Sequence, residues 1–77
     1  MRIVLELQGY LAWYSPGGLE EMALDVPVGT TARQAIRLAR LPHGEVAFAS
    51  VGGALSELDD PLHEGDRVLL IPPIAGG

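Results

Sequence analysis

The chain contains no cysteine and no lysine, and each absence excludes a kind of chemistry. Without cysteine, no disulfide can stabilise the small core that 77 residues are able to form. A chain without cysteine is also typical of proteins that work in a reducing cytosol. Without lysine, no side-chain amine of the protein can be acylated.

Long apolar runs are also missing from the sequence. No run approaches the roughly 18 residues that a membrane-spanning helix needs. Near the N-terminus, the apolar run of residues 3–5 is followed by Glu6 and Gln8, too early for the core of a signal peptide. We therefore expect no membrane association and a cytoplasmic protein.

Basic residues are few, because five arginines face ten acidic residues and leave a net charge of −5. The phosphates of a nucleic acid would be repelled by this charge, so we expect no nucleic-acid partner. The acidic balance fits a partner with a basic surface, and it equally fits a charge that only keeps the protein in solution.

The remaining composition, with 48% hydrophobic residues, predicts one small globular domain. Residues 2–8 alternate with period two and predict a strand that turns Ile3, Leu5 and Leu7 to the core. Residues 20–28 alternate again, and a second strand is predicted with four apolar side chains inward: Met22, Leu24, Val26 and Val28.

The connection between these two strands, residues 9–18, is rich in aromatic residues and glycine. The two alternating runs that it joins predict an antiparallel hairpin. We expect Tyr10, Trp13 and Tyr14 to pack over one end of the core. The alternative is that these three aromatics form a binding surface, because aromatic loop residues are enriched at interfaces.

A single helix is predicted to follow. Thr31 and Gln34 have the spacing of a capping box, in which each side chain satisfies a backbone donor of the other residue. Four apolar residues at helical spacing form one face that can lie close to a sheet: Ala32, Ala35, Ile36 and Ala39. Residues 41–44 (Leu-Pro-His-Gly) end the helix.

The second half of the chain predicts three more extended segments. Residues 45–51 form a third strand, and Gly52-Gly53 turns the chain into a short fourth strand over residues 54–56. The final strand is the apolar run of residues 68–71, which the chain enters through a turn at residues 64–66.

The last six residues, Pro-Pro-Ile-Ala-Gly-Gly, have an unusual composition for a frayed terminus. Pro72 and Pro73 end the strand, because proline has no N–H to donate, and they favour a stiff extended backbone. The segment could reach about 20 Å from the sheet. Gly76 and Gly77 have no side chains, so this tip can enter a channel too narrow for other residues. A disordered tail is the alternative.

No catalytic constellation is present in the sequence. His43 and His63 lie in predicted loops without a cysteine nearby, which gives little support to a metal site. The acidic residues Asp59, Asp60 and Glu64 could bind a hard cation such as calcium, but they are explained more simply as exposed loop residues. We expect neither a bound metal nor a bound cofactor.

The order of elements resembles the β-grasp fold of the ubiquitin superfamily. More narrowly, the chain resembles the sulfur carriers of the molybdopterin synthase small subunit and thiamine sulfur carrier family (the MoaD/ThiS family), and is more similar to the molybdopterin group. Three stretches carry the resemblance: residues 28–31 before the helix, residues 62–68 before the last strand, and the tail of residues 71–77. The family often has Val-Asn-Gly where this chain has Val51-Gly52-Gly53, and the loop of residues 10–18 matches no group.

The resemblance implies an α+β fold with a mixed sheet of four to five strands and one main helix. Residues 1–73 would form the β-grasp domain and residues 74–77 a flexible tail. It further implies that a ubiquitin-activating-like adenylyltransferase uses ATP to adenylate Gly77, which becomes a C-terminal thiocarboxylate. A large synthase subunit would then accept the tail: Pro72, Pro73, Ile74, Ala75, Gly76 and Gly77.

The family pattern also implies that Val68 and Leu70 lie in the core under the helix. Because successive side chains of a strand point to opposite faces, Leu69 and Ile71 are then expected on the open face of the sheet, beside Val4 of the first strand. An apolar patch that stays open on a small protein usually marks an interaction site. We therefore predict that Val4, Leu69 and Ile71 bind the partner enzymes.

Three other functions are compatible with the same residues. The chain could carry sulfur for thiamine thiazole or cysteine synthesis, it could be a ubiquitin-like modifier of other proteins, or it could be an interaction module whose Gly-Gly is incidental.

Overall fold

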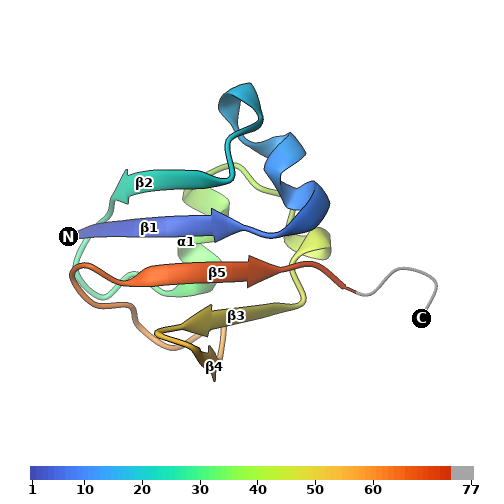
Figure 1. The fold of residues 1–77 in the computed structure, drawn as a ribbon. Helices are drawn as coiled ribbons and strands as arrows, with labels where there is room; N and C mark the ends of the chain where they lie inside the picture. The colour runs from blue at the N-terminus through green and yellow to red at the C-terminus, as the bar shows by residue number, and fades with distance from the viewer. Residues whose placement is uncertain (74–77) are drawn as a thin grey trace.

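The computed structural model describes residues 1–73, which form a five-stranded sheet with one α-helix against it (Figure 1). The strands are β1 (Arg2–Leu7), β2 (Glu21–Asp25), β3 (Phe48–Val51), β4 (Ala54–Ser56) and β5 (Arg67–Ile71). Their order in the sheet is β2-β1-β5-β3-β4, with β1 and β5 parallel and the other neighbours antiparallel. The α+β architecture with a mixed sheet is the one that the sequence predicted.

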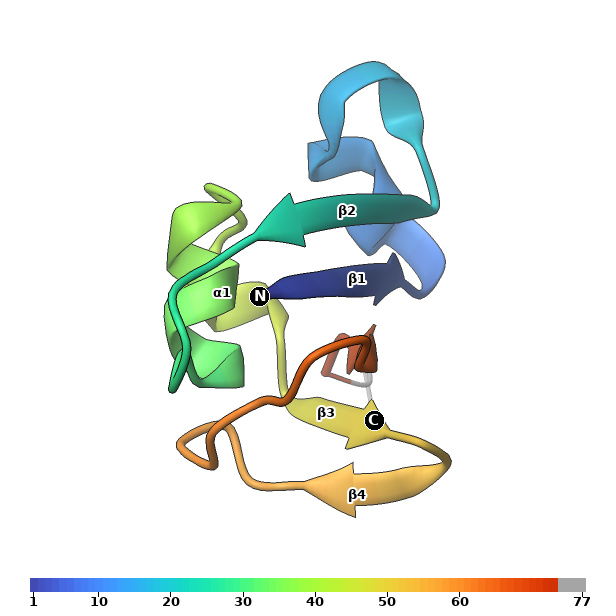
Figure 2. The ribbon, with the colours of Figure 1, turned by 90° about the vertical axis from the view of Figure 1, so that its left-hand side faces the viewer.

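The helix α1 (Ala32–Leu38) covers one face of this sheet (Figure 2). The core lies between α1 and the inward side chains of β1 and β5, and it includes Ile3, Leu5, Leu70, Ala35 and Ile36, all with at most 1% exposure. Because alanine is small, α1 can lie close to the sheet. In Figure 1 the helix lies behind the sheet, so the face toward the viewer is the open face.

The start of α1 is fixed by the predicted capping box. The Gln34 N–H donates to Thr31 Oγ1 at 3.1 Å, and the Thr31 N–H donates to Gln34 Oε1 at 3.0 Å. Two donors that the first helical turn would leave unpaired are thereby satisfied. The predicted inward face is also confirmed, since Ala32, Ala35 and Ile36 are buried and Ala39 packs partly buried against the core.

The end of α1 depends on Arg40, which adopts a left-handed backbone with a φ of 61°. Its N–H donates to the Arg37 carbonyl at 3.0 Å, and the Leu41 N–H reaches back to the Ile36 carbonyl at 3.0 Å. This pair of bonds is a Schellman motif, whose left-handed position is usually glycine. The helix therefore ends at Leu38, before Pro42 could break it.

Replacing Arg40 with glycine should stabilise the protein by about 0.5–1 kcal/mol, because glycine adopts a left-handed backbone without the cost that a Cβ imposes. Guanidinium titration of the purified variant measures this gain. Arg40→Ala is the matched control, since it removes the same charge and keeps the Cβ. An equal gain in both variants would assign the effect to charge and contradict this explanation.

Two predicted strands are shorter in the structure than in the sequence pattern. Val28 was expected inward and is 89% exposed, because β2 ends at Asp25 and the chain turns at Pro27. The Pro27 carbonyl accepts both the N–H and the hydroxyl of Thr30. The third strand was expected from residue 45, but a 3-10 turn, η3 (His43–Glu45), precedes it and β3 begins at Phe48.

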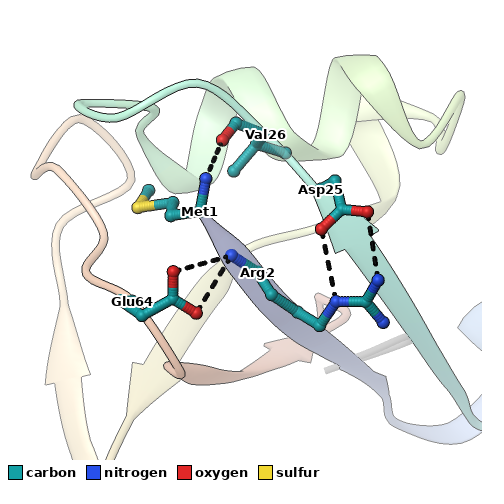
Figure 3. A network of polar contacts seen from close by, with 5 residues as sticks. All are labelled: Met1, Arg2, Asp25, Val26 and Glu64. Atoms are coloured by element: carbon teal, nitrogen blue, oxygen red, sulfur yellow. Dashed lines mark hydrogen bonds and ion pairs between the residues drawn. The ribbon is translucent and has the colours of Figure 1, made fainter.

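The first residues of β1 are held by polar contacts from both sides (Figure 3). The Met1 ammonium group donates to the Val26 carbonyl at 2.6 Å, and the Arg2 guanidinium pairs with Asp25. From the other side, the Arg2 N–H lies 3.2 Å from each carboxylate oxygen of Glu64, in the turn before β5. These contacts fix the register of β1 against β2 and the turn into β5.

Candidate functional site

The end of β5 is where the tail leaves the folded body. β5 is a central strand, and its last carbonyls are paired on both sides: Leu70 accepts from the Gln8 N–H at 3.3 Å, and Ile71 accepts from the Ala47 N–H at 2.8 Å. The ladder ends there, as the prolines predicted, with Pro72 half-buried and Pro73 exposed. The predicted tail residues Ile74, Ala75, Gly76 and Gly77 lie outside the described residues.

The two faces of β5 are arranged as the sequence analysis expected. Val68 and Leu70 are fully buried against the core. Leu69 and Ile71 are half-buried on the open face. The strand that positions the tail therefore also presents two apolar side chains away from α1.

These two residues have apolar neighbours that the sequence analysis missed. Ile71 lies opposite Phe48, and Leu69 lies opposite Ser50, which in turn pairs with Leu55. Phe48 is 56% exposed and Leu55 is 74% exposed. We call the group Phe48, Leu55, Leu69 and Ile71 the apolar half of the open face; a shallow cavity of about 400 Å³ adjoins it at Phe48 and Leu55.

The remainder of the open face is charged, and the structure places Val4 there. Val4 lies opposite Ala23 of β2 and Arg67 of β5, so Arg67 and Glu6 lie between it and the apolar half. Arg67 donates to Glu6 at 3.1 Å and also to Glu21, and these two carboxylates raise the pKa of its guanidinium. Val4 shares the face of Leu69 and Ile71 but lies directly opposite neither of them in the sheet.

The loop between β1 and β2 does not pack as predicted. It forms two 3-10 turns, η1 (Gly9–Tyr14) and η2 (Pro16–Gly18), and the residues that enter the core are Leu11 and Ala12. Trp13 is 82% exposed. In a 3-10 helix residues three apart lie above one another, so Tyr10 and Trp13 share the outer side when Leu11 points inward.

The polar end of Tyr10 is held by η3. Its hydroxyl donates to Glu45 Oε2 at 2.5 Å, and this bond, made by the neutral form, raises the pKa of the phenol. The Tyr10 and Trp13 rings are tilted, with their centroids 6.5 Å apart. The hydrogen bond from Tyr10 to Glu45 ties the loop to η3, at the end of the sheet where β5 ends.

Two of the three acidic residues considered as cation ligands, Asp59 and Glu64, have other partners. Asp59 accepts from Arg33 at 2.7 Å, and Glu64 accepts from the Arg2 N–H (Figure 3). The His63 N–H donates to Asp66 at 2.8 Å. Within residues 1–73, no three histidine, aspartate or glutamate side chains come together in a way that could hold a metal ion.

Part of the free energy of unfolding should depend on pH in the acid range because of the Arg33–Asp59 ion pair. The hydrogen bond from Arg33 lowers the pKa of Asp59 below its ordinary value of 3.8. The pair therefore stabilises the fold fully above that pH, and this contribution is lost as the pH falls through the pKa of Asp59 in the folded state. We expect Arg33→Gln to be less stable than the wild-type chain near neutrality, with a difference that shrinks in acid. Urea titrations over this pH range measure it, and Arg37→Gln, on the same helix, should show no such pH dependence.

Most of the chain matches a known protein family. Residues 10–77 match the model of the ThiS family. The chain belongs to the ThiS family. Protein RnfH of Cereibacter sphaeroides is 47% identical over 57 residues, which cover 66% of this chain and 67% of that protein. Protein RnfH of Halorhodospira halophila is 37% identical over 65 residues, which cover 77% of this chain and 67% of that protein.

Solved structures confirm the β-grasp, ubiquitin-like fold of this ThiS-family chain. SAMP1 from Haloferax volcanii superposes with a TM-score of 0.73 over the whole of both chains at 19% identity. A Pyrococcus furiosus protein assigned as subunit 1 of a molybdopterin converting factor gives 0.71 over 96% of this chain and 99% of its own, at 22% identity. One chain of a complex of subunits 1 and 2 of the Helicobacter pylori molybdopterin-converting factor gives a TM-score of 0.63, over the whole of that chain and the whole of this one, at 19% identity. In residues 1–73, no helix is long and apolar enough to cross a membrane.

Proposed function

We propose that this ThiS-family chain is a sulfur carrier that acts through its last residue, Gly77, and donates sulfur in molybdopterin biosynthesis. The observation that carries the proposal is the extent of the family match, which runs through residue 77 and so includes the whole Pro-Pro-Ile-Ala-Gly-Gly segment. Support for the molybdopterin pathway comes from the folds of two structural relatives that are named as molybdopterin converting factor subunits.

The proposed chemistry needs no acid, base or nucleophile from the domain itself. The Gly77 carboxylate attacks the α-phosphate of ATP on an adenylyltransferase, which releases pyrophosphate and forms an acyl-adenylate. A sulfide equivalent then displaces AMP and leaves a thiocarboxylate. Because a carboxylate is a poor electrophile, activation must precede sulfur loading. Since activation consumes ATP, we place the reaction in the cytoplasm.

Two partners follow from this chemistry, an activating adenylyltransferase and a large synthase subunit that accepts the tail. We propose that both hold the open face of the sheet through Leu69 and Ile71, together with the exposed Phe48 and Leu55 beside them. Val4 would contact a partner separately, at the charged part of the open face beside Arg67 and Glu6. The Helicobacter pylori complex of subunits 1 and 2 provides a precedent for such an assembly on this fold.

A protein-modifier function is the second candidate. It is favoured by the structural relatives from Haloferax volcanii, one of which is named small archaeal modifier protein 1. The activated Gly77 would then form an amide with an amine of another protein. Sulfur carriage for thiamine or cysteine synthesis would use the same terminus with different partners.

Intact mass spectrometry of the chain isolated from its own cells separates these functions. A carrier should show a fraction heavier by the exchange of one oxygen for sulfur, and that fraction should disappear when the adenylyltransferase gene is deleted. A modifier should instead appear in conjugates of higher mass. Detection of neither form in growing cells would refute the proposed function.

A further inference from the structure

The aromatic residues of η1 form an exposed group that neither the core nor the proposed chemistry uses. Trp13 is 82% exposed and Tyr14 is 48% exposed, while Tyr10 lies partly buried beside Trp13. Three of the four aromatic residues of the chain are therefore gathered in one six-residue turn. We call Tyr10 and Trp13, whose rings lie against each other, the aromatic shelf.

The backbone under the shelf is firmly held, so the rings are presented by a fixed element. Leu11 and Ala12 are anchored in the core with exposures of 0% and 8%. The buried Ser15 hydroxyl lies 2.9 Å from the Ala12 carbonyl and 2.6 Å from the Leu19 carbonyl. A preorganised aromatic group loses little conformational entropy when it binds a partner.

The shelf also lies beside the base of the tail. η1 begins at Gly9, and a Cβ at that position would be 3.9 Å from Pro72 Cγ. The preceding residue, Gln8, donates its N–H to the Leu70 carbonyl of β5. Figure 1 shows η1 and the end of β5 at the same end of the sheet. A protein that takes up the tail therefore meets the shelf at the same time.

The charge around the shelf favours a cation. Residues 8–20 contain no arginine, lysine or histidine, and the Glu45 carboxylate accepts a hydrogen bond from the Tyr10 hydroxyl at 2.5 Å. The face of a tryptophan ring attracts guanidinium and ammonium groups, and a carboxylate near the ring strengthens that attraction. The net charge of −5 adds a long-range attraction for a basic surface.

We propose that the aromatic shelf is a docking point for an arginine or lysine side chain of the enzyme that accepts the tail, next to the entrance of its channel. This inference rests on the proposed function and adds a second contact to it, separate from the apolar half of the open face. Trp13 supplies the ring face, Tyr10 positions it, and Glu45 provides the opposite charge.

Trp13 is the single tryptophan of the chain, which allows a direct test. Fluorotryptophan incorporated at this position gives one fluorine NMR signal, which should shift when the purified adenylyltransferase or large synthase subunit is added. Trp13→Ala should weaken binding about tenfold or more, as loss of an interface anchor does, and Trp13→Phe should restore part of it. Glu45→Gln should reduce the salt dependence of binding. Val28→Ala, at another exposed apolar residue, should bind as the wild-type chain does.

The outcomes separate this inference from the proposed function. If the adenylyltransferase adenylates the wild-type chain, and both enzymes bind Trp13→Ala as tightly as the wild-type chain, the docking point is overturned and the carrier function stands. A wild-type chain that the enzyme does not adenylate would overturn both. If phosphatidylserine vesicles shift the fluorine signal and the enzymes do not, the shelf is a membrane contact and the proposal is wrong.

Discussion

Removing Gly77, or adding one residue after it, should lower the rate of adenylation by about a hundredfold or more. On the proposed function, the Gly77 carboxylate has to reach the α-phosphate of ATP in the partner's active site, and a displacement of one residue length moves it well beyond attack distance. Pyrophosphate release from ATP in the presence of the adenylyltransferase measures this rate. The fold should not change, because the ordered ladder ends at Ile71 and Pro73 is already exposed.

Equal stability is the necessary control for this result. Urea titration of the truncated and extended chains should give free energies of unfolding within about 0.5 kcal/mol of the wild-type value. Under that condition, loss of adenylation can be assigned to the terminus alone. An extended chain that still forms an acyl-adenylate at the wild-type rate would contradict the proposal that Gly77 is the reacting residue.

The substitutions Leu69→Gln and Leu70→Gln should lower the stability by very different amounts, although the residues are adjacent and the change is the same. Leu70 is fully buried, so an amide there loses its apolar contacts and lacks hydrogen-bond partners. We expect a destabilisation of about 3 kcal/mol or more, a large part of the stability of a 77-residue domain. Leu69 is half-buried on the open face, and Leu69→Gln should cost less than about 1 kcal/mol.

Binding to the large synthase subunit should show the reverse order for these two variants. Leu69→Gln should lose about 1 kcal/mol or more of binding free energy, as expected for an interface anchor. Leu70→Gln, measured where it remains folded, should bind as the wild-type chain does. Calorimetry with the purified subunit provides the measurement. A tolerant Leu70 together with an unstable Leu69 would mean that the two faces of β5 have been assigned the wrong way round.

Much of the fold was predictable because short stretches determine it. Thr31 and Gln34 cap α1 through contacts within one turn, and the alternation of Ile3, Leu5 and Leu7 assigns the faces of β1 without knowledge of its neighbours. Gly52 and Gly53 both have positive φ values, 61° and 86°, as a two-residue hairpin turn requires. Each of these features depends on residues close together in the chain.

The features that the sequence did not reveal depend on contacts between distant residues. Phe48 and Leu55 join Leu69 and Ile71 only because β5 lies next to β3 in the sheet, an order that local patterns do not contain. Trp13 was expected to pack over one end of the core. Leu11 and Ala12 take that place instead, because the connection folds into 3-10 turns rather than a flat hairpin. Arg40, in a left-handed position that normally belongs to glycine, gave no signal in the sequence.

The central position of β5 has a mechanical consequence for a protein handled by its tail. β5 has hydrogen-bonded neighbours on both sides, parallel to β1 and antiparallel to β3. A pull on the tail acts along this strand, so it loads both rows of hydrogen bonds in shear at the same time. An edge strand such as β4 would instead peel away one bond after another. On the proposed function, a partner enzyme would therefore be able to pull on the tail and release it again while the domain resists the force as one body.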